Sequence, residues 1–494
     1  MAPVWRWSFA GGNVAVMRRR LRSVALLAFV AAVSCRPSEA PRPNILFILV
    51  DDLRWDDIAV AGHSFVETPN IDRLAREGTR FLNAFAATPL CSPSRATILT
   101  GQYAHTNGIV DNTARDSASH QLPTFAVPLA AAGYQTGFFG KWHMGNDDTP
   151  RPGWTRWVAM RGQGEAVDPQ LNMDGTRRVV PGYVTDVLTD QVVDFVRSSG
   201  DRPFMAFLAH KALHPNVMQA NDGRVGQLRA GQPEGFVPAP RHAGRYATPP
   251  ITRRPNALVP PTGKKALERA IPGLPPLSPA TGTPERDIRA RLEMLLAVDE
   301  SLGRVVAALD SLGTLDRTMI VFTSDHGYFY GEFGLNEERR LAYEETARIP
   351  LLVRYPPMAR PGATPAPMVQ TTDFASTILE VAGVKDGTAR DGRSIVPLLV
   401  GDAPADWRTS LLVEYWTDIV FPRTLTMGYQ AVRTDRYTFI RYKELQGMDE
   451  LYDLRADPFQ LTNIIDTEAG RAALPALTRE LDRLVKSGPT IAPR

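Results

Sequence analysis

The chain has 494 residues, of which 44% are apolar and 22% charged, and it contains 38 glycines and 41 prolines. This composition is that of a globular protein and excludes a collagen-like, coiled-coil or disordered chain. The formal net charge is +3, but residues 1–34 carry five arginines and no acidic residue, which leaves the remainder at −2. No nucleic-acid-binding surface is therefore expected. Two cysteines are too few for a disulfide scaffold or a Cys-ligated zinc site.

The N-terminus has the pattern of an export signal. A basic segment that begins at Met17 precedes the apolar run 23–33, which is too short for a membrane-spanning helix. We predict a signal peptide over residues 1–34 and a tether over 35–43. The residues Ala-Val-Ser before Cys35 resemble a bacterial lipobox. They predict a lipid anchor at Cys35 and an exported, periplasmic or outer-membrane-anchored lipoprotein, with a plain secretory signal as the alternative.

Strands alternate with helices along residues 44–401. The expected strands are 44–50, 135–139, 202–209 and 317–323, and the expected helices are 68–77 and 284–312. Such alternation predicts an α/β domain with a mainly parallel sheet. Residues 220–283 are rich in proline and glycine and are expected to form a surface insertion.

The pattern changes after residue 401. Short antiparallel strands are expected at 410–416, 427–434 and 437–443, and a final helix at 474–485. Residues 402–494 are therefore predicted to form a small C-terminal α+β subdomain.

Polar side chains follow each of the four expected strands of the large domain. They are Asp51 and Asp52, then Lys141 and His143, then His210, Lys211 and His214, and finally Asp325 and His326. Ligands of open α/β sheets bind at the carboxyl ends of the strands, so these groups are expected on one rim. Taken singly, each has an ordinary structural explanation, such as a helix cap or a buried histidine. The three carboxylates and one imidazole of Asp51, Asp52, Asp325 and His326 suit Ca²⁺, Mg²⁺ or Mn²⁺ better than zinc or copper.

The segment 90–101 contains the second cysteine. Pro93 suits the first turn of a helix, which puts Cys91 just ahead of that turn, where free backbone N–H groups favour an anion. Arg95 adds a fixed positive charge. A thiolate nucleophile of low pKa and a buried structural cysteine are both compatible with this pattern.

Cys91-Ser-Pro-Ser-Arg95, followed by Ala-Thr-Ile-Leu-Thr-Gly101, resembles the signature of the type I, formylglycine-dependent sulfatases. The resemblance extends, in chain order, through 43–46, 51–52, 140–143, 211–215, 323–327, 342–345, 348–354 and 451–458. It implies an alkaline-phosphatase-like fold: a large mixed sheet sandwiched by helices over 44–401, with the small α+β subdomain over 402–494. Residues 182–190 and 428–436 are most similar to the N-acetylglucosamine-6-sulfatase branch.

This resemblance also implies a mechanism. A formylglycine-generating enzyme would oxidise Cys91, and the product would share one Ca²⁺ with Asp51, Asp52, Asp325 and His326. The hydrated aldehyde would attack sulfur, His214 would protonate the leaving alcohol, and His143 would take the proton of the second hydroxyl. Arg95 and Lys141 would stabilise the sulfate charge. Arg339 stands where the family has a catalytic lysine; it can hold sulfate but not readily give up a proton, and a surface arginine is the alternative.

The expected function is hydrolysis of a sulfate ester on a sugar, with 6-O-sulfo-N-acetylglucosamine in a glycosaminoglycan or related glycan as substrate. A phosphonate or phosphate ester hydrolase of the same superfamily, and an inactive sulfated-glycan-binding lipoprotein, are the alternatives. The cations expected near the pocket are Lys211, Arg339, Arg340, Arg423, Arg433 and Arg436. The aromatic residues expected there are Tyr328, Tyr330, Tyr415 and Trp416, with packing at the subdomain junction as the alternative.

Overall fold

A computed structural model describes residues 1–8, 42–417 and 419–486. Most of the predicted signal peptide and tether, Cys35 included, lies outside these residues. Residues 1–8 have no regular secondary structure, and the compact unit begins at Arg42. Within the described part of the chain, no helix is both long and apolar enough to cross a membrane.

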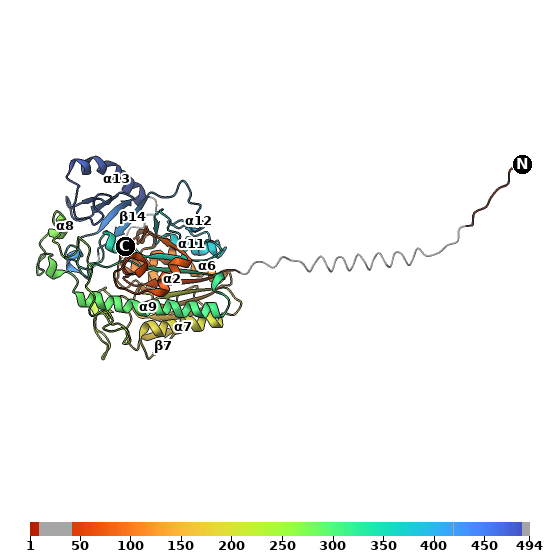
Figure 1. Ribbon diagram of the computed structural model, residues 1–494, viewed down its shortest axis with the longest axis horizontal. Coiled ribbons are helices and arrows are strands. Elements are labelled where there is room, and N and C mark those ends of the chain that lie inside the picture. Colours follow the sequence, from red (N-terminus) through yellow and green to blue (C-terminus); the bar gives the residue numbers. More distant parts are fainter. Residues whose placement is uncertain (9–41, 418, 487–494) are drawn as a thin grey trace. The chain divides into compact units, whose positions relative to one another are not determined.

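A nine-stranded mixed sheet forms the centre of this unit (Figure 1). In spatial order its strands are β2 (Thr79–Phe81), β12 (Leu351–Arg354), β11 (Thr318–Ser324), β1 (Asn44–Val50), β8 (Phe204–Ala209), β4 (Gln135–Lys141), β5 (Arg156–Met160), β6 (Gln170–Met173) and β7 (Thr176–Val179). The strands from β11 to β5 run parallel. Antiparallel strands flank them at both edges. The predicted mixed α/β architecture is confirmed.

Both faces of the sheet are covered because its central strands are apolar throughout. On β1, Ile45, Phe47 and Leu49 face one hydrophobic core, and Leu46, Ile48 and Val50 face the other. The first core is completed by α3 (Cys91–Thr100), α6 (Ala126–Ala131), α11 (Asp373–Val381) and α12 (Val396–Val400). The second is completed by α2 (Pro69–Glu77), α7 (Val184–Ser198) and α9 (Glu285–Ser311). Figure 1 shows α7 and α9 side by side.

The predicted strands and helices are present with small shifts at their ends. The sequence pattern missed β2, β5 to β7 and β12, which are short or carry polar residues; every residue of β7 is exposed. It also missed α7 and α11. Shorter helices are α4 (Ala104–Asn107), α5 (Asp116–His120) and α10 (Glu344–Ala347).

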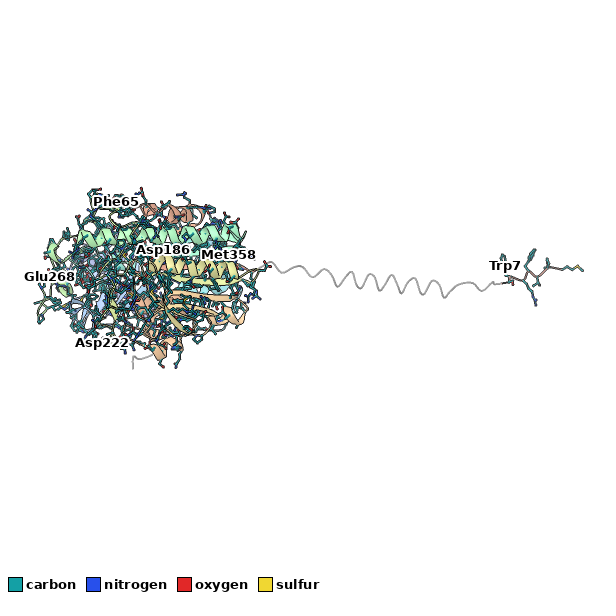
Figure 2. All side chains as sticks on the ribbon, turned by 90° about the horizontal axis from the view of Figure 1, so that it is seen from below. Trp7, Phe65, Asp186, Asp222, Glu268 and Met358 are labelled. Atoms are coloured by element: carbon teal, nitrogen blue, oxygen red, sulfur yellow. The ribbon has the colours of Figure 1, made fainter. Side chains whose placement is uncertain are left out.

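The insertion 220–283 has little regular structure, as expected. It contains β10 (Val225–Gly226), paired with β9 (Met218–Gln219), then α8 (Lys265–Glu268) and a 3₁₀ turn at Pro279–Thr281. Figure 2 shows Asp222 and Glu268, both from this insertion, at the outside of the compact unit.

The C-terminal region has a separate antiparallel sheet. Its strands, in spatial and chain order, are β14 (Ser410–Tyr415), β15 (Tyr429–Thr434), β16 (Tyr437–Tyr442) and β17 (Glu450–Asp453). α13 (Glu468–Lys486), which begins six residues before the expected helix, covers one face through Leu477, Leu481 and Leu484. Val413 and Tyr415 on the other face pack against Tyr343 and Leu341 of the large domain. The small α+β subdomain is therefore confirmed, and its boundary at residue 402 stays a prediction.

Candidate active site

The pairing of β1 with β11 brings two acidic segments together. Val50 and Ser324 are partners at the ends of these parallel strands, so the residues that follow them emerge at the same rim. The Asp52 backbone N–H donates to Asp325 Oδ1 at 3.0 Å, and the His326 N–H donates to the same oxygen at 2.9 Å. The four side chains that were expected to bind a cation are fully buried: Asp51, Asp52, Asp325 and His326.

Cys91 reaches the same rim from the other direction. It is the first residue of α3, one position further into the helix than expected, and is only 1% exposed. Its Sγ lies 3.4 Å from His326 Nε2. Potential ligand atoms of Asp51, Cys91, Asp325 and His326 all lie within 4.8 Å of one another. Burial raises the pKa of the Cys91 thiol to about 12, which argues against a thiolate nucleophile of low pKa.

Two buried cations face the carboxylates. Lys141 Nζ pairs with Asp51 Oδ2. Arg95 Nη2 lies 2.9 Å from Asp325 Oδ2 and 3.4 Å from Asp51 Oδ1, and Arg95 Nη1 donates to the Lys141 carbonyl at 2.6 Å. Gly140, directly before Lys141, has a φ of +119°. The backbone lies so close to β8 there that a Cβ at position 140 would be 2.0 Å from the Ala209 carbonyl oxygen, so glycine at this position allows the orientation of Lys141.

The two neighbouring carboxyls have opposite pKa shifts. Burial alone would raise the pKa of Asp51, but the charges of Lys141 and Arg95 outweigh it and hold that pKa well below its usual range. Burial and the negative charge of Asp51 raise the pKa of Asp325 to about 8. The neighbouring cations therefore stabilise the ionised form of Asp51 but not that of Asp325.

The residues at this rim fit a divalent cation. Asp51 Oδ1 and both carboxylate oxygens of Asp52 are buried and accept no hydrogen bond, although Arg95 Nη2 lies 3.4 Å from Asp51 Oδ1 and Arg339 Nε lies 2.8 Å from Asp52 Oδ1. The His326 Nδ1 lies 2.9 Å from the Gly327 carbonyl oxygen, which can only accept, so Nδ1 carries the proton and the Nε2 lone pair faces the cluster. A hard cation would be coordinated by these oxygens and would favour the ionised form of Asp325.

The two histidines that were expected to transfer protons, His143 and His214, are close to this cluster and buried. Burial and the charge of Lys141 hold the pKa of both His143 and His214 well below the usual range, so both are neutral bases at neutral pH. His214 Nδ1 contacts the Pro215 carbonyl at 2.9 Å, and His143 Nε2 contacts Gln219 Oε1 at 2.5 Å.

Arg339 belongs to the site and is not a surface arginine. Its side chain is 6% exposed, and Nε lies 2.8 Å from Asp52 Oδ1. Arg339 and His214 line a pocket to which the insertion and the C-terminal region also contribute residues. The residues that line this pocket include Asn112, Gln163, Gln219, Arg224, Phe236, Arg286, Arg340 and Phe421.

The prediction of which cations and aromatic residues lie near the pocket is only partly correct. Arg339 and Arg340 line the pocket, whereas Arg423, Arg433 and Arg436 pair with Glu338, Glu344 and Asp453 away from its lining. Lys211 is buried and donates to the Gln163 and Pro215 carbonyls. The aromatic residues Tyr328, Tyr330, Tyr415 and Trp416 also lie outside the lining, the three tyrosines being packed in the interior. Phe236 and Phe421 occupy the pocket wall instead.

Sequence reasoning missed one buried positioning group, Arg291 of α9. It donates to the Asp52 carbonyl at 2.6 Å and to the Leu213 carbonyl at 3.1 Å, and it stacks 3.9 Å from the Tyr328 ring centroid. Arg291 thereby connects Leu213, the residue before His214, with the pair Asp51 and Asp52. The only available signal was a charged residue on the apolar side of a helix.

This fold and this site define a hydrolase of alkaline-phosphatase-like architecture, with a cluster of carboxylates and an imidazole beside a buried cysteine. The family model described as Sulfatase matches residues 43–384, and that described as N-sulphoglucosamine sulphohydrolase, C-terminal, matches residues 331–487. The chain belongs to the sulfatase family and is a sulfuric ester hydrolase.

Several relatives share most of the chain. An N-acetylglucosamine-6-O-sulfatase of Bacteroides thetaiotaomicron is 30% identical, over 97% of this chain and 93% of its own. The N-acetylglucosamine-6-sulfatase of Homo sapiens is 29% identical, over 86% and 81%. A solved structure of a protein in complex with its substrate D-glucosamine-2-N,6-O-disulfate has a TM-score of 0.78 and 29% identity, covering 90% of this chain and 98% of that one. A phosphonate monoester hydrolase from Silicibacter pomeroyi, at 24% identity, TM-score 0.70 and 91% and 96% coverage, shares the fold.

The raised pKa of Asp325 generates a prediction about cation binding. Asp325 must lose its proton to act as a ligand, whereas His326, with a pKa of about 4, is already neutral. We therefore expect the affinity for Ca²⁺ to rise by up to about tenfold per pH unit between about pH 6 and pH 8. Titration calorimetry in two buffers of different ionisation enthalpy measures both the affinity and the proton released. Saturation at 100 times the Kd is expected to stabilise the fold by about 2.7 kcal/mol.

Asp325→Asn is the matched control, because it keeps the shape of the side chain without the titrating proton. Its affinity should be weaker and nearly independent of pH over the same range. A wild-type affinity that does not change with pH would contradict the proposed ligand set.

Proposed function

We propose that this sulfatase removes the 6-O-sulfate of N-acetylglucosamine in a glycosaminoglycan or related glycan, and that it acts through a formylglycine made from Cys91 by a formylglycine-generating enzyme. The observation that carries the proposal is the buried Cys91 at the N-terminus of α3, with Pro93 and Arg95 at the signature spacing, facing the carboxylate cluster. The named activity of the relatives that share most of the chain supports the choice of sugar.

Each component has a distinct contribution. Formylglycine supplies, as its hydrate, the hydroxyl groups that a thiol of raised pKa cannot replace. Ca²⁺, held by Asp51, Asp52, Asp325, His326 and the modified Cys91, would balance the carboxylates and polarise the sulfate oxygens. The chain's own Lys141 and Arg95 fix the orientation of the carboxylates and add positive charge next to residue 91.

Proton transfer is assigned to the two buried histidines. His214 lines the pocket, and we assign to it the protonation of the departing alcohol. A negative sulfate next to it would favour its charged form. His143, neutral and on the side of α3, accepts the proton released at residue 91. Arg339 binds sulfate oxygen and donates no proton, because a guanidinium does not deprotonate in this range.

The pocket wall fits a sugar sulfate. Phe236 from the insertion and Phe421 from the C-terminal region offer apolar faces for a pyranose ring. Arg224 and Arg286 also line the pocket, each beside an aspartate: Asp222 at 3.6 Å and Asp287 at 3.4 Å. Both arginines are largely exposed, 67% and 85%. This arrangement favours a substrate whose sugar ring is contacted by the pocket wall beside the reacting sulfate.

We further propose that the enzyme is exported and anchored by a lipid at Cys35. The basic and apolar segments, with small residues directly before Cys35, support this assignment. An exported enzyme would encounter polymeric glycans, which lie outside the cytoplasm.

Mass spectrometry of the peptide that contains Cys91 tests the nucleophile. We expect an aldehyde in place of the thiol in active preparations. Cys91→Ala should lower kcat by roughly 10³-fold or more because the nucleophile is removed. Cys35→Ala, which changes the other cysteine, is the matched control and should keep full activity. Full activity of a preparation that carries only the unmodified thiol would refute the assignment.

A panel of defined sulfated glucosamines tests the substrate. We expect 6-O-sulfated N-acetylglucosamine to have the highest kcat/KM among 6-O-, 3-O- and N-sulfated compounds, because the homologous enzymes named above act at that position. Phe421→Ala should raise KM for the sugar while leaving kcat close to wild type. A preference for another sulfate position, or for an aryl phosphonate, would defeat the substrate assignment.

Fractionation of a bacterial host tests the anchor. Wild-type protein should partition with membranes, and Cys35→Ala should move it to the soluble exported fraction, because the acyl chains are its membrane attachment. Wild-type protein that is already soluble outside the cytoplasm would show that the signal is a plain secretory one.

A further inference from the structure

Four buried residues form a closed circuit of hydrogen bonds next to Cys91. Asn112 Oδ1 accepts a hydrogen bond from the Ser92 N–H at 3.1 Å, and Gln219 Nε2 donates to the backbone carbonyl of Asn112. Gln219 Oε1 lies 2.5 Å from His143 Nε2, and the Ser92 hydroxyl donates to the His143 carbonyl at 2.5 Å. None of the four is more than 7% exposed. The circuit therefore links the N-terminus of α3 rigidly to His143.

The circuit fixes which way the Gln219 amide points. The Asn112 carbonyl can only accept, so the amide nitrogen of Gln219 must face it. Gln219 Oε1 also accepts from Gln163 Nε2 at 3.1 Å. Gln219 consequently presents an acceptor to His143 Nε2, and that ring nitrogen must carry the proton.

The second ring nitrogen of His143 then has the lone pair. His143 Nδ1 lies 3.4 Å from Ser92 Oγ. The single hydroxyl proton of Ser92 is already donated to the His143 carbonyl, so it does not occupy the Nδ1 lone pair. Since Ser92 directly follows Cys91, the basic atom of the imidazole faces the helix end that bears the nucleophile.

We propose that Gln219 is a positioning residue that holds His143 as its Nε2–H tautomer and so leaves Nδ1 as the proton acceptor for the reaction at residue 91. This inference rests on the proposed role of His143 in the sulfatase reaction. It also gives the insertion a place in the mechanism, because Gln219 lies on β9, which pairs with β10 of the insertion.

Gln219→Met tests the inference, since methionine has a similar length and offers no strong acceptor. In protein labelled with ¹⁵N-histidine, wild-type His143 should show a protonated Nε2 and an unprotonated Nδ1, and Gln219→Met should lose that pattern. The kcat should fall by about 10²-fold, the lower end of the range for lost acid–base catalysis, with KM nearly unchanged. Release of the first equivalent of alcohol should stay fast, because the step assigned to His143 follows it.

Two further variants make the result specific. Gln219→Glu keeps an acceptor opposite Nε2, so it should preserve the protonated Nε2 and recover about tenfold in kcat over Gln219→Met at alkaline pH, where the imidazole is neutral. Gln191→Met, on α7 and bonded to Arg156, is the matched control and should behave as wild type.

The outcomes separate the two proposals. A wild-type Nδ1–H tautomer, or a Gln219→Met variant with unchanged kcat and histidine spectrum, would overturn the role of Gln219. Equal losses in kcat and in folded fraction, without a tautomer change, would show a purely structural role and also overturn it. Failure of the wild-type enzyme on 6-O-sulfated glucosamine would defeat the substrate assignment, while the spectrum would still decide the tautomer.

Discussion

The structure depends on one electrostatic constraint, which is that three carboxylates are buried together at the ends of β1 and β11. Such a cluster is unstable unless positive charge surrounds it. Lys141, Arg95 and Arg339 supply three positive charges, each from a different segment. Even so, burial and the charge of Asp51 raise the pKa of Asp325, and Asp51 Oδ1 and the Asp52 oxygens accept no hydrogen bond, so a further cation would stabilise the ionised cluster.

Buried side chains from the helices on both faces of the sheet contact this cluster. Arg291, in the N-terminal part of the long helix α9, hydrogen-bonds to the carbonyls of Asp52 and Leu213, so this helix connects the carboxylate pair with the histidine segment. From the opposite layer, α3 brings Cys91 to the cluster and is itself held by Asn112. Helices on both faces of the sheet thus aim their polar groups at a single rim.

Specificity comes from parts of the chain outside this scaffold. Gln219 and Phe236 lie at or near the irregular insertion, and Phe421 belongs to the C-terminal region, yet all three line the pocket above His214 and Arg339. Most catalytic groups therefore come from strand ends and from the first turn of α3, next to the sheet, whereas the walls come from segments whose conformation depends on long-range packing. This division allows the family to keep one chemistry while its substrates vary.

The sequence by itself determined the α/β class, the four principal strands, the long helix and the set of polar residues at the strand ends, because these follow from local apolar patterns and from residue order. It also determined Cys91 and its signature. Tertiary structure alone decided that Arg339 pairs with Asp52, that Arg423, Arg433 and Arg436 are engaged elsewhere, and that Phe236 and Phe421 replace the expected tyrosines. Gln219 had no local signal, and Arg291 had only its charge on the apolar side of a helix. Their roles depend on hydrogen bonds to residues 76 and 239 positions away. Periodicity identifies which side chains are buried, but only the folded chain determines which polar partners they meet.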